Sequence, residues 1–205
     1  MEPLMMFTTI LVALITAVLG PIAVEWARNY FKTKPKKSPI QEALETNTLV
    51  SDQLDIILNY LNCDRVWVAQ FHNGGHFYPT GKSIQKFSVF YETTTPGTTP
   101  LHPDFQNVPC SAFPKALAEV YSKGEVAIPN YNEGENYDLK GISQKYGSQS
   151  TYLVGLYSLD NHLIGVMTIS YNKKPHTLTK DEWIYLRQKV GVVGTLLSDY
   201  LKCRK

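Results

Sequence analysis

Cysteine is scarce in this chain, and its cysteines stand far apart. The three are Cys63, Cys110 and Cys203, and no C-x-x-C pair occurs. A disulfide framework needs an even, closely spaced set of cysteines, and a structural zinc site needs clustered thiolates or imidazoles. His72 and His76 have no third ligand at a suitable spacing. The sequence therefore predicts neither a disulfide scaffold nor a metal site.

The chain also lacks a marked excess of charge of one sign. Its formal charge is +2, of which residues 1–37 carry +3, so residues 38–205 carry −1. Proteins that bind nucleic acid cluster Lys and Arg against the phosphates, so this balance argues against such a partner. The P-loop, nucleophile elbow, HExxH and dinucleotide signatures are missing too. We therefore expect no enzymatic activity and no cofactor.

One long uncharged run stands at the N-terminus. Pro3–Val24 has 22 residues and no charged side chain. A helix of that length spans about 30 Å, the thickness of the hydrocarbon core of a bilayer. We expect residues 1–31 to form a retained single-pass anchor rather than a cleaved signal peptide or a buried core helix. Gly20-Pro21 is expected to kink this helix and not to end it.

Basic residues follow this run and predict its orientation. They are Arg28, Lys32, Lys34, Lys36 and Lys37. By the positive-inside rule, the remainder of the chain is expected on the cytoplasmic side of a plasma (inner) membrane or a host cell membrane. Residues 32–39, with four lysines and two prolines, are expected to form an extended linker over anionic headgroups. The lipid bilayer is thus the first expected partner.

A helix is predicted from Ile40 to Leu61. Six residues recur at alternating spacings of 4 and 3 and so form one stripe along the helix, called the seam below. They are Ala43, Asn47, Val50, Leu54, Ile57 and Leu61. Two interpretations of this seam stay open. The helix is either one strand of a parallel coiled-coil dimer, with Asn47 setting the register, or an amphipathic helix that covers the sheet of its own domain.

Strand and helix signals alternate through the rest of the chain. Strands are predicted at 65–71, 84–91, 125–128, 150–158 and 163–171, and helices at 113–123, 139–146 and from Thr179 onward. The run Thr93–Pro103 is expected to be a surface loop that contributes nothing to the core. About 170 residues follow the anchor, enough for one domain, residues 40–205. The fold class is α+β, an antiparallel sheet flanked by helices.

Specific segments resemble GAF domains. Ser150–Leu197, with the strands YLVGLYS and LIGVMTISY and a long final helix, resembles the C-terminal half of that family. Phe113–Pro129 (FPKALAEVYSKGEVAIP) resembles the family's helix, glycine and short strand. The resemblance covers about residues 40–202. It implies a GAF-like fold, small-ligand sensing and dimerisation, here through the Ile40–Leu61 and Trp183–Leu201 helices.

A second, narrower resemblance is to the T-even phage holin family, whose members permeabilise the host membrane by oligomerising. It rests on one uncharged anchor and on Leu153–Leu197, with Leu159-Asp160-Asn161 at the turn. That family carries a charged segment before its anchor and a periplasmic domain, whereas this chain starts almost directly with the anchor and its lysines predict the opposite orientation. A holin-like protein is therefore kept as the alternative function.

The candidate ligand-binding loop is rich in glycine and aromatic residues. Two glycines allow close backbone approach, while imidazole and amide groups stand beside aromatic rings. The alternative is a glycine-rich hairpin link. The loop residues are Phe71, His72, Asn73, Gly74, Gly75, His76 and Phe77. Glu92, Tyr131 and Tyr137 are further candidates, because GAF folds form a cavity between the sheet and the crossing segments.

One thiol offers an enzymatic alternative. Cys110 precedes a helix, where amide groups can lower a thiol pKa, and GAF-type methionine sulfoxide reductases use cysteines. Neither Cys63 nor Cys203 is an evident resolving partner. We therefore expect a membrane-anchored, non-enzymatic module that binds a small ligand or protein partner and self-associates.

Overall fold

The computed structural model describes residues 8, 12–13, 15–32, 38–133 and 138–201. The chain divides into two compact units, Met1–Gln41 and Glu42–Lys205. In the first unit, a π-helical turn η1 (Ile15–Leu19) leads directly into the α-helix α2 (Gly20–Lys32). Pro21 has no N–H to donate to the preceding turn, which accounts for a change of helical spacing at this point. The helical backbone nevertheless continues across Gly20-Pro21, as expected.

Within the described residues, no helix is both long and apolar enough to cross a membrane. The predicted anchor, residues 1–31, includes residues 1–7, 9–11 and 14, which lie outside the described part. The described residues of the first unit include large apolar side chains that are at least half exposed, among them Ile22, Val24 and Trp26.

The second unit is built on one antiparallel sheet of six strands in the order β3-β2-β1-β6-β5-β4. The strands are β1 (Arg65–His76), β2 (Ser83–Thr94), β3 (Val108–Pro109), β4 (Glu125–Ile128), β5 (Ser150–Tyr157) and β6 (Leu163–Tyr171). The strands β5 and β6 form the predicted hairpin across residues 158–162. The predicted α+β class, with an antiparallel sheet and flanking helices, is confirmed.

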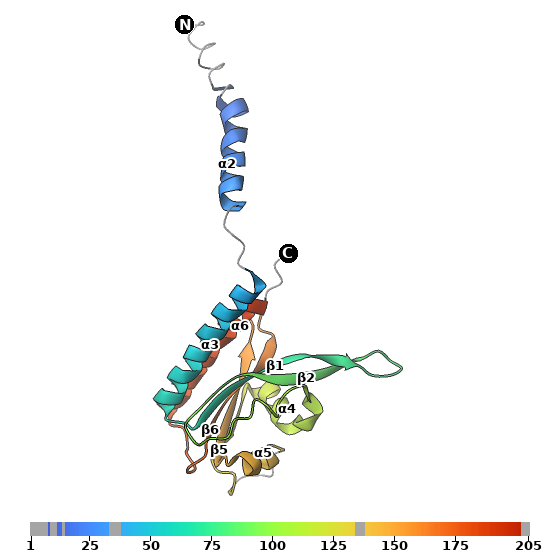
Figure 1. Ribbon diagram of the computed structural model, residues 1–205, viewed down its shortest axis with the longest axis vertical. Helices are drawn as coiled ribbons and strands as arrows, with labels where there is room; N and C mark the ends of the chain where they lie inside the picture. The colour runs from blue at the N-terminus through green and yellow to red at the C-terminus, as the bar shows by residue number, and fades with distance from the viewer. Residues whose placement is uncertain (1–7, 9–11, 14, 33–37, 134–137, 202–205) are drawn as a thin grey trace. The chain divides into compact units, whose positions relative to one another are not determined.

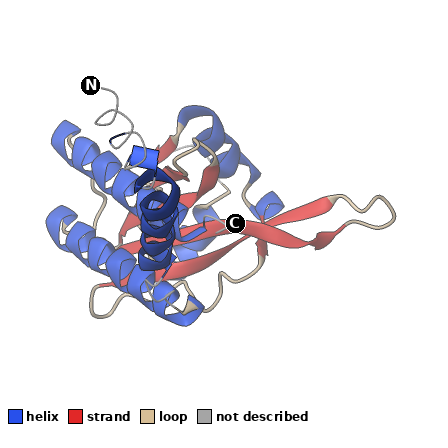
Figure 2. Cartoon of the chain, turned by 90° about the horizontal axis from the view of Figure 1, so that it is seen from above, coloured by secondary structure: helices blue, strands red, loops and turns tan. Residues whose placement is uncertain are grey.

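Helices cover both faces of this sheet (Figure 1). On one face lie α3 (Pro39–Leu61) and α6 (Lys180–Leu201), side by side in both views (Figure 2). On the other lie the short 3-10 turn η2 (Cys110–Ala112), α4 (Pro114–Lys123) and α5 (Lys140–Tyr146). Strand β1 alternates between the two cores, with Val66 and Val68 facing α3 and α6 and Trp67 and Ala69 facing α4 and α5.

The structure decides between the two interpretations of the α3 seam. Val50, Leu54, Ile57 and Leu61 are all buried in the core of their own domain. Asn47 accepts a hydrogen bond from the Tyr91 hydroxyl of its own domain at 2.8 Å. The seam therefore covers the sheet, and the coiled-coil interpretation of these residues is wrong. A period of 3.5 residues cannot distinguish a partner helix from a partner sheet.

Two predicted helix boundaries are confirmed by their capping. Gly124, with φ of 84°, ends α4 in the left-handed conformation. At the start of α6, the Glu182 amide donates to Thr179 Oγ1 at 3.3 Å, and the Thr179 amide donates to Glu182 Oε2 at 2.7 Å. This reciprocal capping box fixes where α6 begins.

The first hairpin differs from the prediction. The strand predicted at 65–71 is longer than expected, because β1 continues to His76 and the turn lies at residues 77–82. The two strands stay paired from Arg65↔Thr94 to His76↔Ser83, with an irregularity between Asn73 and His76. Gly75 has φ of 106°, and the side chain of Lys86 lies across Gly74 where a Cβ would be. The glycines therefore serve a bulged strand and not a turn.

The Thr- and Pro-rich loop also differs from the prediction. Within it Leu101 is only 2% exposed and belongs to the core beside α4 and α5. Its amide and that of His102 donate to the Glu92 carboxylate at 2.8 to 2.9 Å. A buried carboxylate thus holds the loop against the sheet, which composition alone does not reveal.

Candidate functional site

The candidate site lies between the sheet and the layer formed by α4, α5 and the loop after β2. Two small voids open there, each of about 20 Å³, enough for about one water molecule. Both are lined by Trp67, Leu139, Ile142 and Leu153, which stand between them. The first void has Arg65, Ser148, Thr151 and Ser170 in its wall, although most of its surface is apolar, and the second is apolar throughout, with Phe87, Phe105 and Phe113.

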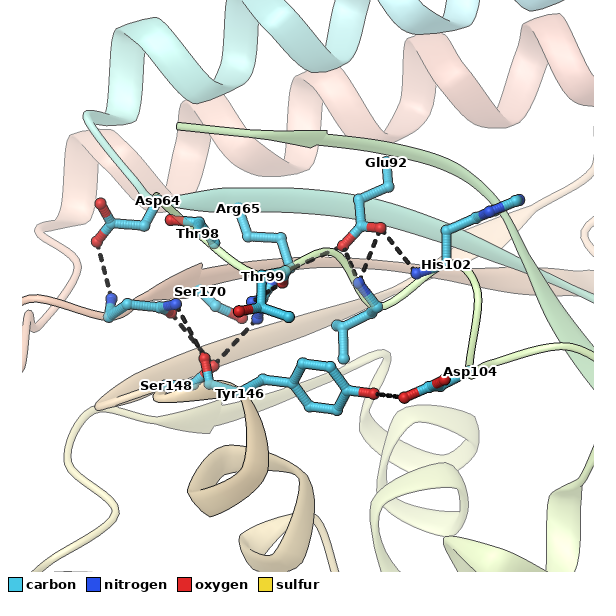
Figure 3. A network of polar contacts seen from close by, with 12 residues as sticks. Asp64, Arg65, Glu92, Thr98, Thr99, His102, Asp104, Tyr146, Ser148 and Ser170 are labelled. Atoms are coloured by element: carbon cyan, nitrogen blue, oxygen red, sulfur yellow. Dashed lines mark hydrogen bonds and ion pairs between the residues drawn. The ribbon is translucent and has the colours of Figure 1, made fainter. Parts of the chain in front are cut away.

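Arg65 is the central polar group of the first void (Figure 3). Its side chain is fully buried, and Nη2 donates to the Thr99 carbonyl at 2.6 Å while Nη1 donates to Ser148 Oγ at 3.4 Å. The guanidinium also lies 5.6 Å from the ring centre of Tyr146. Its Nε is without a hydrogen-bond partner among the described residues. Burial lowers the pKa of Arg65, and the carboxylate of Glu92 opposes this effect.

Glu92 supplies the counter-charge. Its Oε1 lies 3.4 Å from Arg65 Nε, and the two side chains are 5% and 0% exposed, respectively. The same carboxylate accepts the two loop amides described above. Since the pair is electrically neutral as a unit, the site has no need of a charged ligand. At Nε the geometry of this ion pair falls short of a hydrogen bond, so Arg65, in the wall of the first void, keeps one N–H without a hydrogen-bond acceptor among the described residues.

Further polar contacts tie α5 to the loop after β2. The Tyr146 hydroxyl donates a short hydrogen bond to Asp104 (Figure 3). Asp104 also pairs with Lys145 at 2.6 Å. Ser148 Oγ lies 3.3 Å from Asn172 Oδ1, which connects this side of the void to the end of β6. The segment that closes both voids is thus fastened at its C-terminal end.

Asp64 fastens the neighbouring strand ends. Its Oδ2 accepts the Asn172 amide at 2.8 Å, and its Oδ1 lies 3.1 Å from Lys173 Nζ. Burial raises the pKa of Asp64, but the Asn172 and Lys173 donors outweigh it, so the net pKa lies below the usual value. A depressed pKa means that the carboxylate stabilises the fold at neutral pH and loses this effect as the pH falls through the folded-state value.

Asp64→Asn is expected to lower the free energy of unfolding by about 1–3 kcal/mol at pH 7, because hydrogen bonds to a charged acceptor are lost. The difference from wild type should shrink as the pH falls below about 4, where the unfolded aspartate is itself protonated. Urea unfolding at both pH values measures this. Asp160→Asn, in the exposed turn between β5 and β6, is the control. A difference that does not change with pH would contradict the assignment.

The predicted loop residues 71–77 do not line either void. Phe71 packs at the edge of the core, while His72 Nε2 lies 2.9 Å from Ser88 Oγ and Asn73 Oδ1 accepts from Ser83 Oγ at 3.1 Å. Their ligand-binding role remains a prediction. Tyr131 does line the first void, and Glu92 pairs with Arg65 in its wall. Tyr137 lies outside the described residues.

The described thiols are poorly suited to nucleophilic chemistry. Burial raises the pKa of Cys63 to about 12, and burial also raises the pKa of Cys110. The attacking species in thiol chemistry is the thiolate, so these shifts work against the reductase alternative. Cys203 lies outside the described residues. Among those residues there is no group of three or more His, Cys, Asp or Glu side chains that could hold a metal.

Arg65 is the main site residue that the sequence prediction missed. Its signal was present, because Arg65 shares the two-residue alternation of Trp67 and Ala69 and therefore faces the same core. A charged residue on a buried strand face indicates either a buried pair or a binding site. No comparable signal in the sequence marks the other polar residues of the first void, since serine and threonine are common in loops and strands. These residues are Ser148, Thr151 and Ser170.

No protein-family model matches the chain, and no curated protein matches it either. Among solved structures, it is similar to the phycocyanobilin-bound GAF domain of a cyanobacterial phytochrome, with a TM-score of 0.63 and 15% identity over 78% of this chain and 88% of that one. The blue-light-absorbing PixJ GAF domain of Thermosynechococcus elongatus has a TM-score of 0.62 and 15% identity, over 77% and 88% of the two chains.

A third similar structure is the photoproduct state of GAF3 from Slr1393 of Synechocystis sp. PCC6803, with a TM-score of 0.55 and 17% identity over 75% and 94% of the two chains. At these identities the likeness concerns the fold alone. The six-stranded antiparallel sheet with its flanking helices is therefore a GAF-like fold.

Proposed function

We propose that this protein is a non-enzymatic sensor module that binds a small molecule between its sheet and the α4–α5 layer. The observation that carries the proposal is the fully buried Arg65 in the wall of the first void, whose Nε lies 3.4 Å from Glu92 Oε1 but has no hydrogen-bond partner among the described residues. Buried donors in folded proteins are normally paired, so an unpaired one suggests that a ligand or water supplies the acceptor.

The two voids together indicate what kind of molecule fits. A hydrogen-bond acceptor, such as a carbonyl or hydroxyl oxygen, would face Arg65, and an apolar or aromatic body would extend toward Phe87, Phe105 and Phe113. Leu139 and Ile142, which stand between the voids, would have to move for both parts to be filled at once. The ligand-bound state therefore differs from this one in the position of α5.

The proposal is tested by ligand-observed NMR with acetophenone and benzyl alcohol, two probes that combine one oxygen with an aromatic body. The full chain is expected to bind them weakly, and Leu139→Trp, which fills the space between the voids, is expected to abolish binding. Phe77→Ala, on the hairpin, is the matched control and should bind like wild type. Binding that survives Leu139→Trp, or that is lost in Phe77→Ala, would contradict this location.

The phycocyanobilin named for one similar structure does not fit the site as it stands. A ligand of that size needs a cavity of about 300–1,000 Å³, whereas each void here measures about 20 Å³ and is walled by Trp67 and Leu153. Purified chain mixed with biliverdin or phycocyanobilin should elute from gel filtration without visible absorption. The phycocyanobilin-bound GAF domain of the cyanobacterial phytochrome serves as the comparison, and co-elution of pigment with this chain would contradict the prediction.

We further propose that the N-terminal segment attaches the domain to a membrane, with the domain on the cytoplasmic side. The support is the 22-residue uncharged run Pro3–Val24 and the lysines that follow it. Stacked Trp26 and Tyr30, 5.6 Å apart, suit the interfacial region at the end of such a span. Protease protection in intact spheroplasts tests the orientation. The domain is expected to stay protected, and its digestion by protease added outside would place it on the opposite side of the membrane.

Self-association is proposed through the outer faces of α3 and α6, opposite to the seam that covers the sheet. Leu49, Ile56 and Tyr60 on α3 are 44–61% exposed, and Ile184 and Val192 on α6 are 43% and 45% exposed. Tyr60 stacks on Tyr185 at 3.7 Å, which joins the two helices into one surface. Adjacent exposed apolar side chains favour contact with a second copy.

Ile56→Glu combined with Val192→Glu is therefore expected to convert a dimer into a monomer with little change in the fold. Analytical ultracentrifugation of the detergent-solubilised chain gives the mass, and circular dichroism checks the fold. Tyr121→Glu, at an exposed position on α4, is the control. An unchanged mass in the double variant would exclude this interface.

A further inference from the structure

The β1–β2 hairpin projects beyond the rest of the domain as an arm, residues 71–87 (Figures 1 and 2). Pairing of β1 with β6 ends at Gln70↔Gly165, and β2 meets β3 only at Lys86 and Phe87. Beyond these points the two strands of the arm pair only with each other, as far as His76↔Ser83. The core of the domain therefore does not need the outer part of the arm.

The tip of the arm carries two exposed aromatic side chains. Tyr78 is 97% exposed and Phe77 is 55% exposed. Folded proteins rarely leave adjacent large aromatic side chains in water at the end of a projecting hairpin without a partner. Phenol and phenyl rings are enriched where an apolar phase meets water, both at protein interfaces and in the interfacial region of bilayers.

The charge of the arm narrows the choice of partner. No Asp or Glu occurs from Arg65 to Tyr91, a stretch that includes Lys82 and Lys86 on the arm. Lysine beside an aromatic tip complements an anionic surface. A partner that offers both negative charge and an apolar layer beneath it is an anionic bilayer.

The backbone of the tip is also suited to lipid. The Phe77 amide donates to the Lys82 carbonyl and the Gly81 amide donates to the Phe77 carbonyl, both at 2.8 Å. Pro79 has no N–H, and the Lys82 amide lies 3.4 Å from Thr80 Oγ1. Three of the five amides at residues 77, 78, 80, 81 and 82 are therefore paired within the tip, which lowers the cost of moving the tip out of water.

We propose that the arm inserts Phe77 and Tyr78 into the headgroup region of an anionic bilayer, the same bilayer to which the N-terminal segment attaches the chain. The inference rests on the membrane attachment proposed above. It gives the domain a second contact with the lipid, so the arm fixes how the domain is oriented on the membrane surface. It also assigns Phe77, one of the predicted loop residues, a role in lipid binding.

The test places an environment-sensitive thiol dye at Tyr78→Cys in the full chain, with Cys110→Ser and Cys203→Ser as the background and Cys63 left buried. Tyr121→Cys, 77% exposed on α4, is the matched control. The chain is reconstituted into phosphatidylcholine vesicles with or without phosphatidylglycerol, and lipids with nitroxide headgroups act as quenchers. Vesicle flotation is measured in the same samples.

We expect several-fold stronger quenching and a blue shift at position 78 relative to 121, larger with phosphatidylglycerol, and loss of that lipid dependence in Lys82→Glu. Equal signals at both positions in floated vesicles would refute the arm contact and leave the anchor proposal intact. A signal at 78 that follows protein density and not lipid composition would assign the arm to a second protein copy. Failure to float would refute both membrane proposals.

Discussion

Arg65→Met is expected to lower the free energy of unfolding by about 3–5 kcal/mol, because it leaves the Glu92 carboxylate buried without its counter-charge. The two side chains are 0% and 5% exposed. The loop that Glu92 holds, with the buried Leu101, should loosen at the same time. Chemical unfolding followed by circular dichroism measures the effect.

Two controls separate the buried pair from a general loss of an arginine. Arg65→Met combined with Glu92→Gln should recover much of the stability, since the carboxamide carries no charge and can still accept the loop amides. Arg187→Met removes an arginine from the more exposed ion pair with Glu125. This change should lower the free energy of unfolding by no more than about 1 kcal/mol. If Arg65→Met lowers the free energy of unfolding no more than Arg187→Met does, the Arg65–Glu92 pair is not a buried ion pair that stabilises the fold.

Leu54→Ala is expected to lower the free energy of unfolding by about 2–5 kcal/mol, the usual effect of truncating a fully packed leucine. Leu54 is 1% exposed and packs into the core between α3 and the sheet. Ile56→Ala, two residues away on the outer face and 44% exposed, should change the stability of the monomer far less.

The same pair of variants tests the assignment of the α3 seam. If the seam covers the sheet, the loss in Leu54→Ala does not depend on protein concentration. If the seam were a coiled-coil interface, the loss would appear as dissociation and would grow on dilution. Thermal unfolding at two concentrations distinguishes these results.

The sequence was most informative where local chemistry and periodicity agreed. The β5–β6 hairpin, the Gly124 end of α4 and the capping box at Thr179 follow from residues that act on their immediate neighbours. The α+β class followed from the order of these elements. Such features need no knowledge of distant contacts.

The site depended on contacts that span much longer separations. Glu92 reaches Arg65 across the sheet and then holds Leu101, so a loop with no evident core residue became part of the core. The glycines at 74 and 75 suggested a ligand loop, yet they accommodate Lys86 and a bulge in a long hairpin. In each case the deciding interaction lies between residues that no local pattern connects.

The central claim is that a small molecule binds beside Arg65, and methyl NMR of the detergent-solubilised full chain tests it most directly. On titration with acetophenone, the account predicts shifts confined to the methyl groups that line the two voids, chiefly Leu139, Ile142 and Leu153. The same titration of Arg65→Met combined with Glu92→Gln should show weaker binding at the same methyl groups. Shifts of methyl groups elsewhere in the domain would contradict the claim. So would the absence of methyl shifts at an acetophenone concentration that saturates binding to the wild-type chain in ligand-observed NMR.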